Sequence, residues 1–375
     1  MPGKPEKPIP GRGYAPNQIT SPVPIEDASS SYMPMLHGKA TDTMAEMVGR
    51  KFTENPITST YSFKKGEVVL KFGNFKATSL SMSTHKMLCM GIAALTEVNH
   101  VGTGKRQLKE LSVSFSEQEY ALMCGYDVIE HETNTPEEAK KEAARAKNEH
   151  DNARKKFQRD LKALHDASIS WEEKVRGKVE NFEDVHILQR KGIRNGYINM
   201  KFTDDIGGYL INMPITQYPT ALLKLDERNT NAYSLGLRIS EHYSMDNNIR
   251  RGTADLLKVK TLLAYTDLPK IEDVRSKGKG WEERIKEPFE KALDAITRCG
   301  LLKDWEYTHS KGVPMTDEEA APFPFYEAWA DAYIKFTLAN APDHTARLEA
   351  RDTDKEKAEK KRKRKPKAKK ADDEQ

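Results

Sequence analysis

Basic side chains gather beside predicted helices in the last third of this 375-residue chain. Lysine and arginine side chains hold phosphate oxygens, and a guanidinium also pairs bidentately with the O6 and N7 acceptors of guanine. The spacing therefore indicates recognition of a polyanion. The candidate residues are Arg250, Arg251, Lys258, Lys260, Lys277, Lys279, Trp281, Arg284, Lys286, Lys291, His309 and Lys311, together with Lys191 and Arg194 on an earlier hairpin.

One amphipathic helix carries several of these side chains. Between residues 281 and 298, apolar side chains follow the spacing of a single buried helical face. These are Ile285, Pro288, Phe289, Ala292, Leu293 and Ile296, and the opposite face carries Arg284, Lys286, Lys291 and Arg298 beside Glu287 and Asp294. Gly300 is suited to close the helix. Pro288 lacks an N–H and therefore predicts a kink or a helix in two parts.

The elements around this helix predict a winged-helix unit over residues 219–342. A helix with its face at Ala232, Leu235, Ile239 and Tyr243 comes first, then a basic loop at 247–252, a short strand at 256–259 and a short helix. After the amphipathic helix, a strand at 301–307 and a turn at 309–312 form a two-stranded wing. The aromatic residues between 323 and 336 predict a terminal helix whose rings pack inside the fold.

A similar order precedes it and predicts a first winged-helix unit over residues 55–218. Its elements are a strand at 67–72, a helix at 84–98 capped by Ser83, a strand at 111–115 and a short helix after Ser116. A long charged helix at 135–167 is inserted in this unit, either as a solvated connection or as a coiled-coil arm. Strands at 168–171, 184–188 and 196–202 follow, with a basic hairpin tip at 191–196, and Thr203 opens a further helix. The predicted fold class is α+β, with two tandem winged-helix domains.

Both ends of the chain predict disordered tails. Residues 1–45 are rich in proline, and residues 343–375 contain a dense run of lysine and arginine. Such segments bury too little apolar surface to fold alone. The basic tail favours non-specific DNA affinity, although a solubilising tail or a localisation-like signal has the same composition.

Composition and motifs argue against an enzyme, a metal site and a membrane protein. The chain has no phosphate-binding glycine loop, no HExxH and no GxSxG motif. The ten histidines show no metal-ligand spacing, and the three cysteines, Cys89, Cys124 and Cys299, lack a pairing pattern. We therefore expect no catalytic residue, no cofactor and no metal. No apolar run is long enough to span a bilayer, so a cytoplasmic, nucleoid-associated protein is expected.

The order of these segments resembles that of the replication initiators of iteron plasmids. The resemblance rests on Thr84-His-Lys-Met-Leu-Cys-Met-Gly-Ile-Ala-Ala-Leu-Thr-Glu97, Leu111-Ser-Val-Ser-Phe115, Ser116-Glu-Gln-Glu-Tyr120, Asn231-Ala-Tyr-Ser-Leu-Gly-Leu-Arg-Ile239, Trp281-Glu-Glu-Arg-Ile-Lys-Glu-Pro-Phe-Glu-Lys-Ala-Leu-Asp-Ala-Ile296 and Trp305-Glu-Tyr-Thr-His-Ser-Lys-Gly-Val-Pro314. It covers roughly residues 60–340. The helix at 135–167 is longer than the corresponding connection of that family.

This resemblance implies a protein that binds direct repeats of double-stranded DNA at a replication origin. Both units would contact successive major grooves, host helicase or initiator proteins would be recruited, and a homodimer through domain 1 would be the inactive form. Arg284 would reach base edges, Lys258, Lys260, Arg250 and Arg251 would hold phosphates, and His309 and Lys311 would lie on the wing. A winged-helix transcriptional regulator and a partner-docking protein remain as alternative interpretations.

Overall fold

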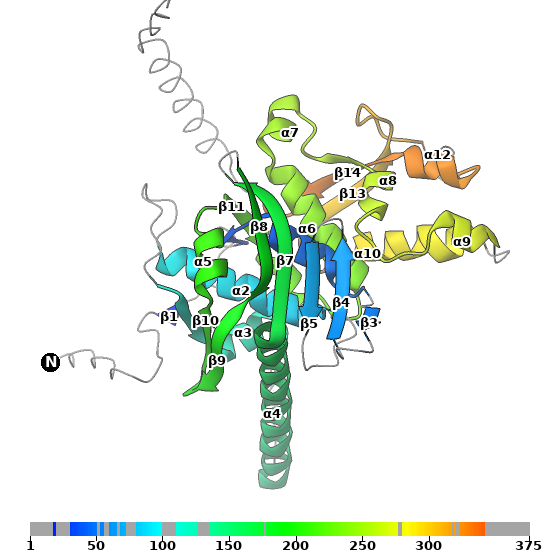
Figure 1. Ribbon diagram of the computed structural model, residues 1–375. Coiled ribbons are helices and arrows are strands. Elements are labelled where there is room, and N and C mark those ends of the chain that lie inside the picture. The colour runs from blue at the N-terminus through cyan, green and yellow to red at the C-terminus, as the bar shows by residue number, and fades with distance from the viewer. Residues whose placement is uncertain are drawn as a thin grey trace, which may run out of the picture.

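The structure is a computed structural model with mixed α+β architecture (Figure 1). It describes residues 18–19, 31–50, 53–55, 60–65, 68–72, 80–99, 110–126, 135–175, 178–276, 280–316, 319 and 323–341. The predicted basic tail and most of the proline-rich tail lie outside these residues. Among the described residues, no helix has the length and apolar composition needed to cross a membrane.

The first unit is organised around the buried helix α2 (Met82–Val98). Its sheet has the strand order β1-β6-β10-β9, in which β6 and β9 both pair antiparallel with β10. The elements of this unit are β1 (Gln18–Ile19), β6 (Ser112–Ser116), α3 (Glu117–Met123), α4 (Pro136–Asp166), β9 (Leu188–Arg194), β10 (Tyr197–Phe202) and α5 (Asp204–Leu210). Asn195 and Gly196 both have positive φ, as the tight turn between β9 and β10 requires.

A second sheet lies beside this unit, with the strand order β3-β4-β5-β7-β8. Its strands are β3 (Thr53–Asn55), β4 (Thr60–Lys65), β5 (Val68–Phe72), β7 (Ala167–Val175) and β8 (Lys178–His186). Strands β7 and β8 follow directly after α4 and curve across the front of the molecule (Figure 1). Trp171 of β7 is fully buried and stacks on Phe182 of β8.

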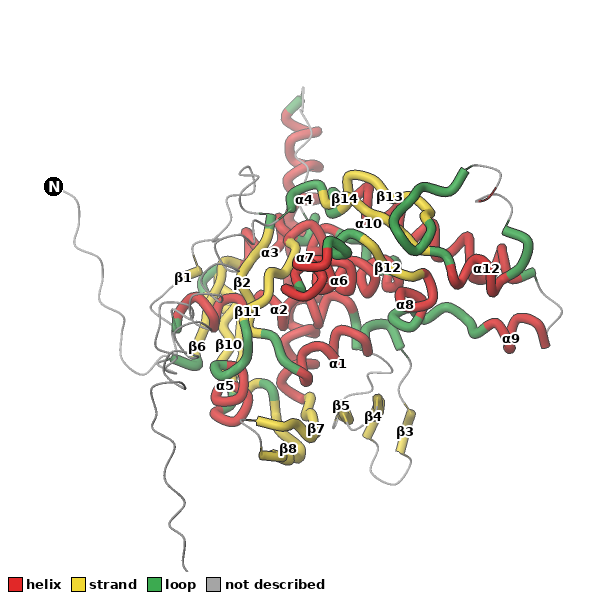
Figure 2. Tube along the Cα trace, turned by 90° about the horizontal axis from the view of Figure 1, so that it is seen from above, coloured by secondary structure: helices red, strands yellow, loops and turns green. Residues whose placement is uncertain are grey.

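The second unit is organised around α6 (Thr230–Ser244), whose buried face contains the predicted Ala232, Leu235 and Ile239. Its sheet has the strand order β12-β14-β13 with antiparallel pairing throughout. Its other elements are α7 (Asp246–Arg251), β12 (Leu256–Lys258), α8 (Val259–Leu263), α9 (Ile271–Ser276), α10 (Glu287–Arg298), β13 (Leu302–Thr308), α12 (Tyr326–Asp331) and β14 (Tyr333–Leu338). Helices α8, α9, α10 and α12 lie together at one end of the molecule (Figures 1 and 2).

The two units repeat one topology. The first unit contains helix α2, strand β6, helices α3 and α4, and strands β9 and β10 in this order, with β7 and β8 between α4 and β9. The second contains helix α6, strand β12, helices α8 and α10, and strands β13 and β14 in the same order, with α7, α9 and α12 between them. In both sheets the first and third of these strands are neighbours and the second pairs with the third. In this shared order, the long helix α4 has the same position as α10.

The predicted N-terminal tail at 1–45 is wrong for residues 31–45. Strand β2 (Tyr32–Leu36) pairs antiparallel with β11 (Ile215–Pro219), and helix α1 (Lys39–Met47) follows it. Met33, Leu36 and Ala40 are buried by these contacts. Pro34 is accommodated because β2 has a partner on only one side in this two-stranded sheet.

Two other predicted elements differ in the structure. Residues 247–251 belong to helix α7 and not to a loop, and Gly252 ends this helix in the left-handed conformation. The predicted terminal helix at 323–336 divides into the short helix α12 and strand β14. Buried and more exposed side chains alternate along β14, so its period is that of a strand.

Most predicted caps are confirmed. Ser116 caps α3, Thr135 forms the capping box of α4, and Thr203 caps α5. Helix α2, however, is capped by Ser81 and not by the predicted Ser83. One continuous hydrophobic core runs through both units, so the boundary expected near residue 218 separates two topological repeats that share their packing.

Candidate nucleic-acid interface

Helix α10 carries the central candidate residues, and its burial follows the predicted pattern. Ile285, Phe289, Ala292, Leu293 and Ile296 are buried, and Ala295 adds to this face. Pro288, predicted to be inside as well, is only half-buried. Burial of each large apolar side chain on this face stabilises the packing of α10 against the rest of the unit by about 1.5–3 kcal/mol.

The helix contains an irregularity where Pro288 predicts one. Residues Glu282–Lys286 form a π-helical turn directly before α10, and Pro288 lies in the first turn of the α-helix. Proline has no backbone N–H to donate to the carbonyl oxygen four residues earlier, as a regular α-helix requires. A π-helical turn before the proline accommodates this missing hydrogen bond. Residues 282–298 therefore form consecutive helical turns, and Arg284 lies on the π-helical one.

A hydrogen-bonded pair of aromatic residues joins α10 to the sheet and to α12. Tyr307 of β13 donates its hydroxyl proton to Glu290 Oε1 at 2.9 Å. The same hydroxyl oxygen accepts a hydrogen bond from Trp329 Nε1 of α12 at 2.8 Å. A neighbouring contact runs from Trp305 Nε1 to Asp294 Oδ1 at 3.2 Å. These bonds fix the rotation of α10 about its own axis.

The outer face of α10 carries charges of both signs. Lys291 pairs with Glu287 at 3.2 Å, and Asp294 is occupied by Trp305. Arg284 and Arg298 are exposed, and no described residue forms an ion pair or hydrogen bond with either side chain. The guanidinium of Arg284, near the start of this helical segment, is therefore available to form hydrogen bonds with a ligand.

Two predicted candidates on this segment are engaged in packing. Trp281 is half-buried and lies against the rings of Tyr326 and Trp329. The side chain of Lys286 is only 15% exposed, with its Nζ 3.9 Å from Glu290 and 5.6 Å from the ring centroid of Phe323. Both residues support the helix from within, which differs from the surface role that the sequence predicts.

Further basic candidates of the second unit lie on α8 and α7. Lys260 is exposed on α8, and Lys258 precedes this helix and pairs with Asp331 at 2.6 Å. That hydrogen bond lowers the pKa of Asp331 and raises the pKa of Lys258. Arg250 and Arg251 are exposed in the last turn of α7. Lys258 therefore already forms an ion pair within the chain, whereas the ammonium group of Lys260 is exposed to solvent.

The turn after β13 has the predicted location. His309 N–H donates to Val313 O and Gly312 N–H donates to His309 O, which closes a tight turn with positive φ at Gly312. Lys311 is exposed at this turn, and His309 lies 3.4 Å from Glu319. After this turn the chain returns only as an isolated bridge between Thr308 and Pro314, and the main partner of β13 is β14, which begins after α12. The two-stranded wing predicted with its tip at 309–312 is therefore not formed, because this turn does not connect β13 to β14.

The remaining candidates are separate from this group. Lys191 and Arg194 lie on β9 of the first unit, on the other side of the molecule from α10 (Figure 1). Lys191 is half-buried, and burial lowers its pKa, while Arg194 is exposed. Lys277 and Lys279 lie outside the described residues. The described candidates of the second unit thus lie on α7, α8, the helical turns at 282–298 and the turn after β13, and the hairpin pair lies apart from them.

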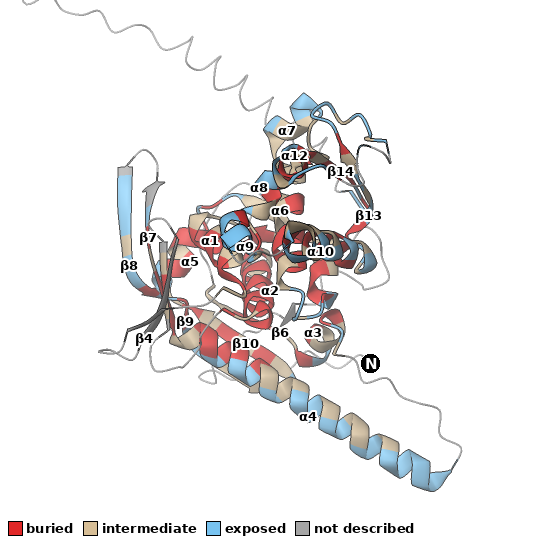
Figure 3. Cartoon of the chain, turned by 90° about the vertical axis from the view of Figure 1, so that its right-hand side faces the viewer, coloured by how far each residue is buried: buried red, intermediate tan, exposed pale blue. Residues whose placement is uncertain are grey.

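Sequence reasoning missed α4 as a second candidate helix. It occupies the position of α10 in the first unit, and its first two-thirds project from the body of the molecule with exposed side chains (Figure 3). Lys140, Lys147, Lys155 and Arg159 are exposed along it. The position of α4 in the repeated order is the only signal that identifies it, because its charge pattern is that of any solvated helix.

Potential metal ligands come together elsewhere. Among the described residues, His37, Asp42 and Glu241 form the one group of three or more histidine, cysteine or carboxylate side chains whose ligand atoms lie within 4.8 Å of one another. No spacing in the sequence predicts this group. The three cysteines are free, as expected. No protein-family model matches the chain, and no curated protein shows significant sequence similarity to it.

Proposed function

We propose that the chain is a sequence-specific double-stranded DNA-binding protein with two winged-helix units. In this proposal it initiates replication of a plasmid or mobile element by binding repeated sites at an origin and recruiting host replication proteins. The observation that carries the proposal is the repeated topology. Each unit contains a helix, a strand, two helices and two strands in the same order, with further elements between some of them, and its first strand lies beside its third. We interpret this shared order as a winged-helix plan, in which the third helix would enter the major groove.

Helix α10 has the properties that a reading helix requires. Its inner face is apolar and buried, its rotation is fixed by the Tyr307–Glu290 hydrogen bond, and Arg284 is exposed near its start. The N-terminal residues of a recognition helix are those that contact base edges. We therefore assign Arg284 to base contact, and Lys260, Arg251 and Lys311 to phosphate contact around it.

Two units in one chain favour a long or repeated site. A single unit covers about one major-groove segment, so two would bind successive grooves on one duplex. Replication initiators of iteron plasmids bind direct repeats, and the segments of this sequence resemble theirs. A homodimer through the first unit and recruitment of host helicase belong to the same proposal.

A footprint of the purified chain on the DNA flanking its own gene tests this function. The experiment uses near-physiological salt and excess random competitor DNA, because phosphate contacts alone give strong binding at low salt. A second protein without residues 355–375 controls for binding by the basic tail. We expect evenly phased protection over direct repeats with both proteins. A single protected inverted repeat would instead indicate a transcriptional regulator, and absence of protection by the folded protein would contradict DNA reading.

A further inference from the structure

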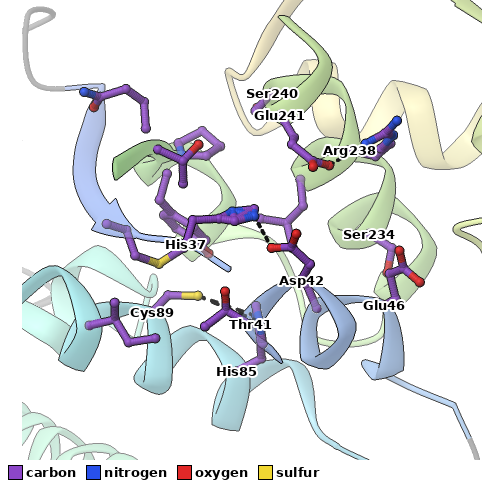
Figure 4. Close-up of a pocket in the computed structure, with 18 of the residues that line it drawn as sticks. His37, Thr41, Asp42, Glu46, His85, Cys89, Ser234, Arg238, Ser240 and Glu241 are labelled. Atoms are coloured by element: carbon purple, nitrogen blue, oxygen red, sulfur yellow. Dashed lines mark hydrogen bonds and ion pairs between the residues drawn. The ribbon is translucent and has the colours of Figure 1, made fainter. Parts of the chain in front are cut away.

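A cavity of about 230 Å³ lies where the two units and the N-terminal segment meet. Its walls come from β2 and α1, from α2 of the first unit, from β11, and from α6 of the second unit. Figure 4 shows His37 and Asp42 in contact at its edge, with the carboxylate of Glu241 directed toward the same point from α6. None of the residues that line the cavity is assigned to DNA contact.

From this geometry we propose a divalent transition-metal site formed by His37, Asp42 and Glu241, with Zn²⁺ as the matching ion. Their ligand atoms all lie within 4.8 Å of one another. Ligands of a tetrahedral zinc ion, each at about 2.0–2.2 Å from the metal, are roughly 3.4 Å apart. Small side-chain rotations therefore bring one imidazole nitrogen and two carboxylate oxygens into a single shell.

The donor set determines the class of ion. Imidazole nitrogen suits zinc, iron, nickel and copper, whereas a site for Mg²⁺ or Ca²⁺ uses oxygen ligands alone. Three protein ligands leave a fourth position open to water, which is the arrangement of an accessible zinc site. All three side chains are partly exposed, with exposed fractions of 18%, 39% and 31% for His37, Asp42 and Glu241, so an ion can reach them from solvent.

A second observation supports a polar occupant of this cavity. Ser240, the neighbour of Glu241 on α6, lines the cavity and is 3% exposed. Its hydroxyl oxygen has no hydrogen-bond partner among the described residues. Buried hydroxyl groups normally have a partner, and a metal-bound water in the cavity would supply one.

Arg238 orients the carboxylate of Glu241 by bonding to only one of its two oxygens. Its Nη1 lies 2.6 Å from Glu241 Oε2, which leaves Oε1 for a metal. Arg238 also lies over the ring of Tyr265, 4.8 Å from its centroid, which limits the freedom of the guanidinium. Groups that hold a ligand in this way typically raise metal affinity. The bound ion would join α1 to the first helix of the second unit.

Metal binding by the full-length, tag-free chain tests the proposal. After chelator treatment and buffer exchange, the protein is titrated with Co²⁺, whose visible absorption reports its coordination by protein ligands, and then with competing Zn²⁺. We expect one ion per chain and a higher melting temperature with Zn²⁺, because an ion that binds only the folded state stabilises it. Failure of the wild-type chain to bind either ion would overturn the proposal.

Conservative variants locate the ion. Glu241→Gln, Asp42→Asn and His37→Gln should each weaken Co²⁺ binding at least about tenfold. Glu180→Gln, at an exposed position on β8, should leave it unchanged. Circular dichroism of the metal-free proteins distinguishes loss of a metal ligand from loss of the fold, and only variants that remain folded are compared. Unchanged binding in the folded variants would show that the ion is held elsewhere and would overturn the assignment.

Discussion

Tyr307 and Glu290 are joined by a 2.9 Å hydrogen bond that links strand β13 to helix α10. Because the tyrosine hydroxyl also accepts from the indole of Trp329, this one oxygen connects the sheet, α10 and α12. The outward direction of Arg284 therefore depends on contacts on the inner side of the unit. If α10 binds DNA as proposed, these inner contacts should then influence its affinity for the site.

Replacing Tyr307 with phenylalanine tests this dependence. The change leaves the buried indole N–H of Trp329 without an acceptor and removes the donor to Glu290, at a cost of about 1–3 kcal/mol in the free energy of unfolding. Affinity for the specific DNA site should fall as well, although no basic residue is altered. Urea unfolding and DNA-binding titrations measure the two effects. Tyr197→Phe on β10 is the matched control, and an equal effect of both variants on DNA binding would contradict the dependence.

Lys86 is a buried cation that joins the first unit to the segment leading to the second. Its side chain lies in the core, and Nζ donates to Leu223 O at 2.7 Å and to Leu225 O at 2.6 Å. Burial lowers the pKa of Lys86. Lys86→Met should leave two buried carbonyl groups unsatisfied and reduce the free energy of unfolding by about 1–3 kcal/mol.

Urea unfolding at neutral pH checks this value. Lys155→Met, at an exposed position on α4, is the control and should change stability by less than about 0.5 kcal/mol. If Lys86→Met is as stable as the wild type, the carbonyl groups must find other partners and the lysine is not a structural link.

Asp160 predicts a specific dependence of stability on pH. It lies on α4 and accepts hydrogen bonds from Ser83 Oγ at 2.9 Å and Thr84 Oγ1 at 2.8 Å, at the start of α2. Burial raises its pKa to about 6, above the ordinary 3.8, despite these bonds. The folded state therefore binds the proton more tightly than the unfolded state. The contribution of Asp160 to the free energy of unfolding is therefore largest below about pH 4 and is lost as the pH rises to about 6.

Asp160→Asn removes this contribution. The variant should be more stable than the wild type at pH 7, by up to roughly 3 kcal/mol, and should lose the corresponding slope between about pH 4 and pH 6. Urea unfolding across this range is the measurement, with Asp151→Asn, exposed on the same helix, as control. A slope that persists in Asp160→Asn would assign it to other groups.

Local patterns predicted the elements of the second unit well. The face of α10, the strand before its turn, and caps such as Thr135 and Thr203 depend on residues a few positions apart, so periodicity and capping chemistry reveal them. Strand β14 was predicted as a helix because the aromatic residues of 323–336 fit helical spacing. The alternation of Ile334, Phe336 and Leu338 with more exposed residues is the pattern that determines the strand.

Long-range contacts explain what the sequence did not predict. Residues 32–36 follow a proline-rich segment, and they form a strand only because β11, some 180 residues later, pairs with them. The group of His37, Asp42 and Glu241 has the same origin, since α1 and α6 bring it together. Trp281 and Lys286 were predicted at the surface from their types, whereas their burial depends on the position of α12 and of Phe323.

The central claim is that α10 reads duplex DNA through Arg284. The most direct measurement is the ratio of affinities for the footprinted site and for random duplex of equal length, at near-physiological salt, in the wild type, Arg284→Ala and Lys311→Ala. We predict that Arg284→Ala lowers this ratio by about 1–3 kcal/mol in binding free energy. Lys311→Ala should weaken both affinities alike and reduce the slope of log affinity against log salt concentration by about one, which corresponds to the loss of one phosphate contact. An unchanged ratio in Arg284→Ala would contradict the account.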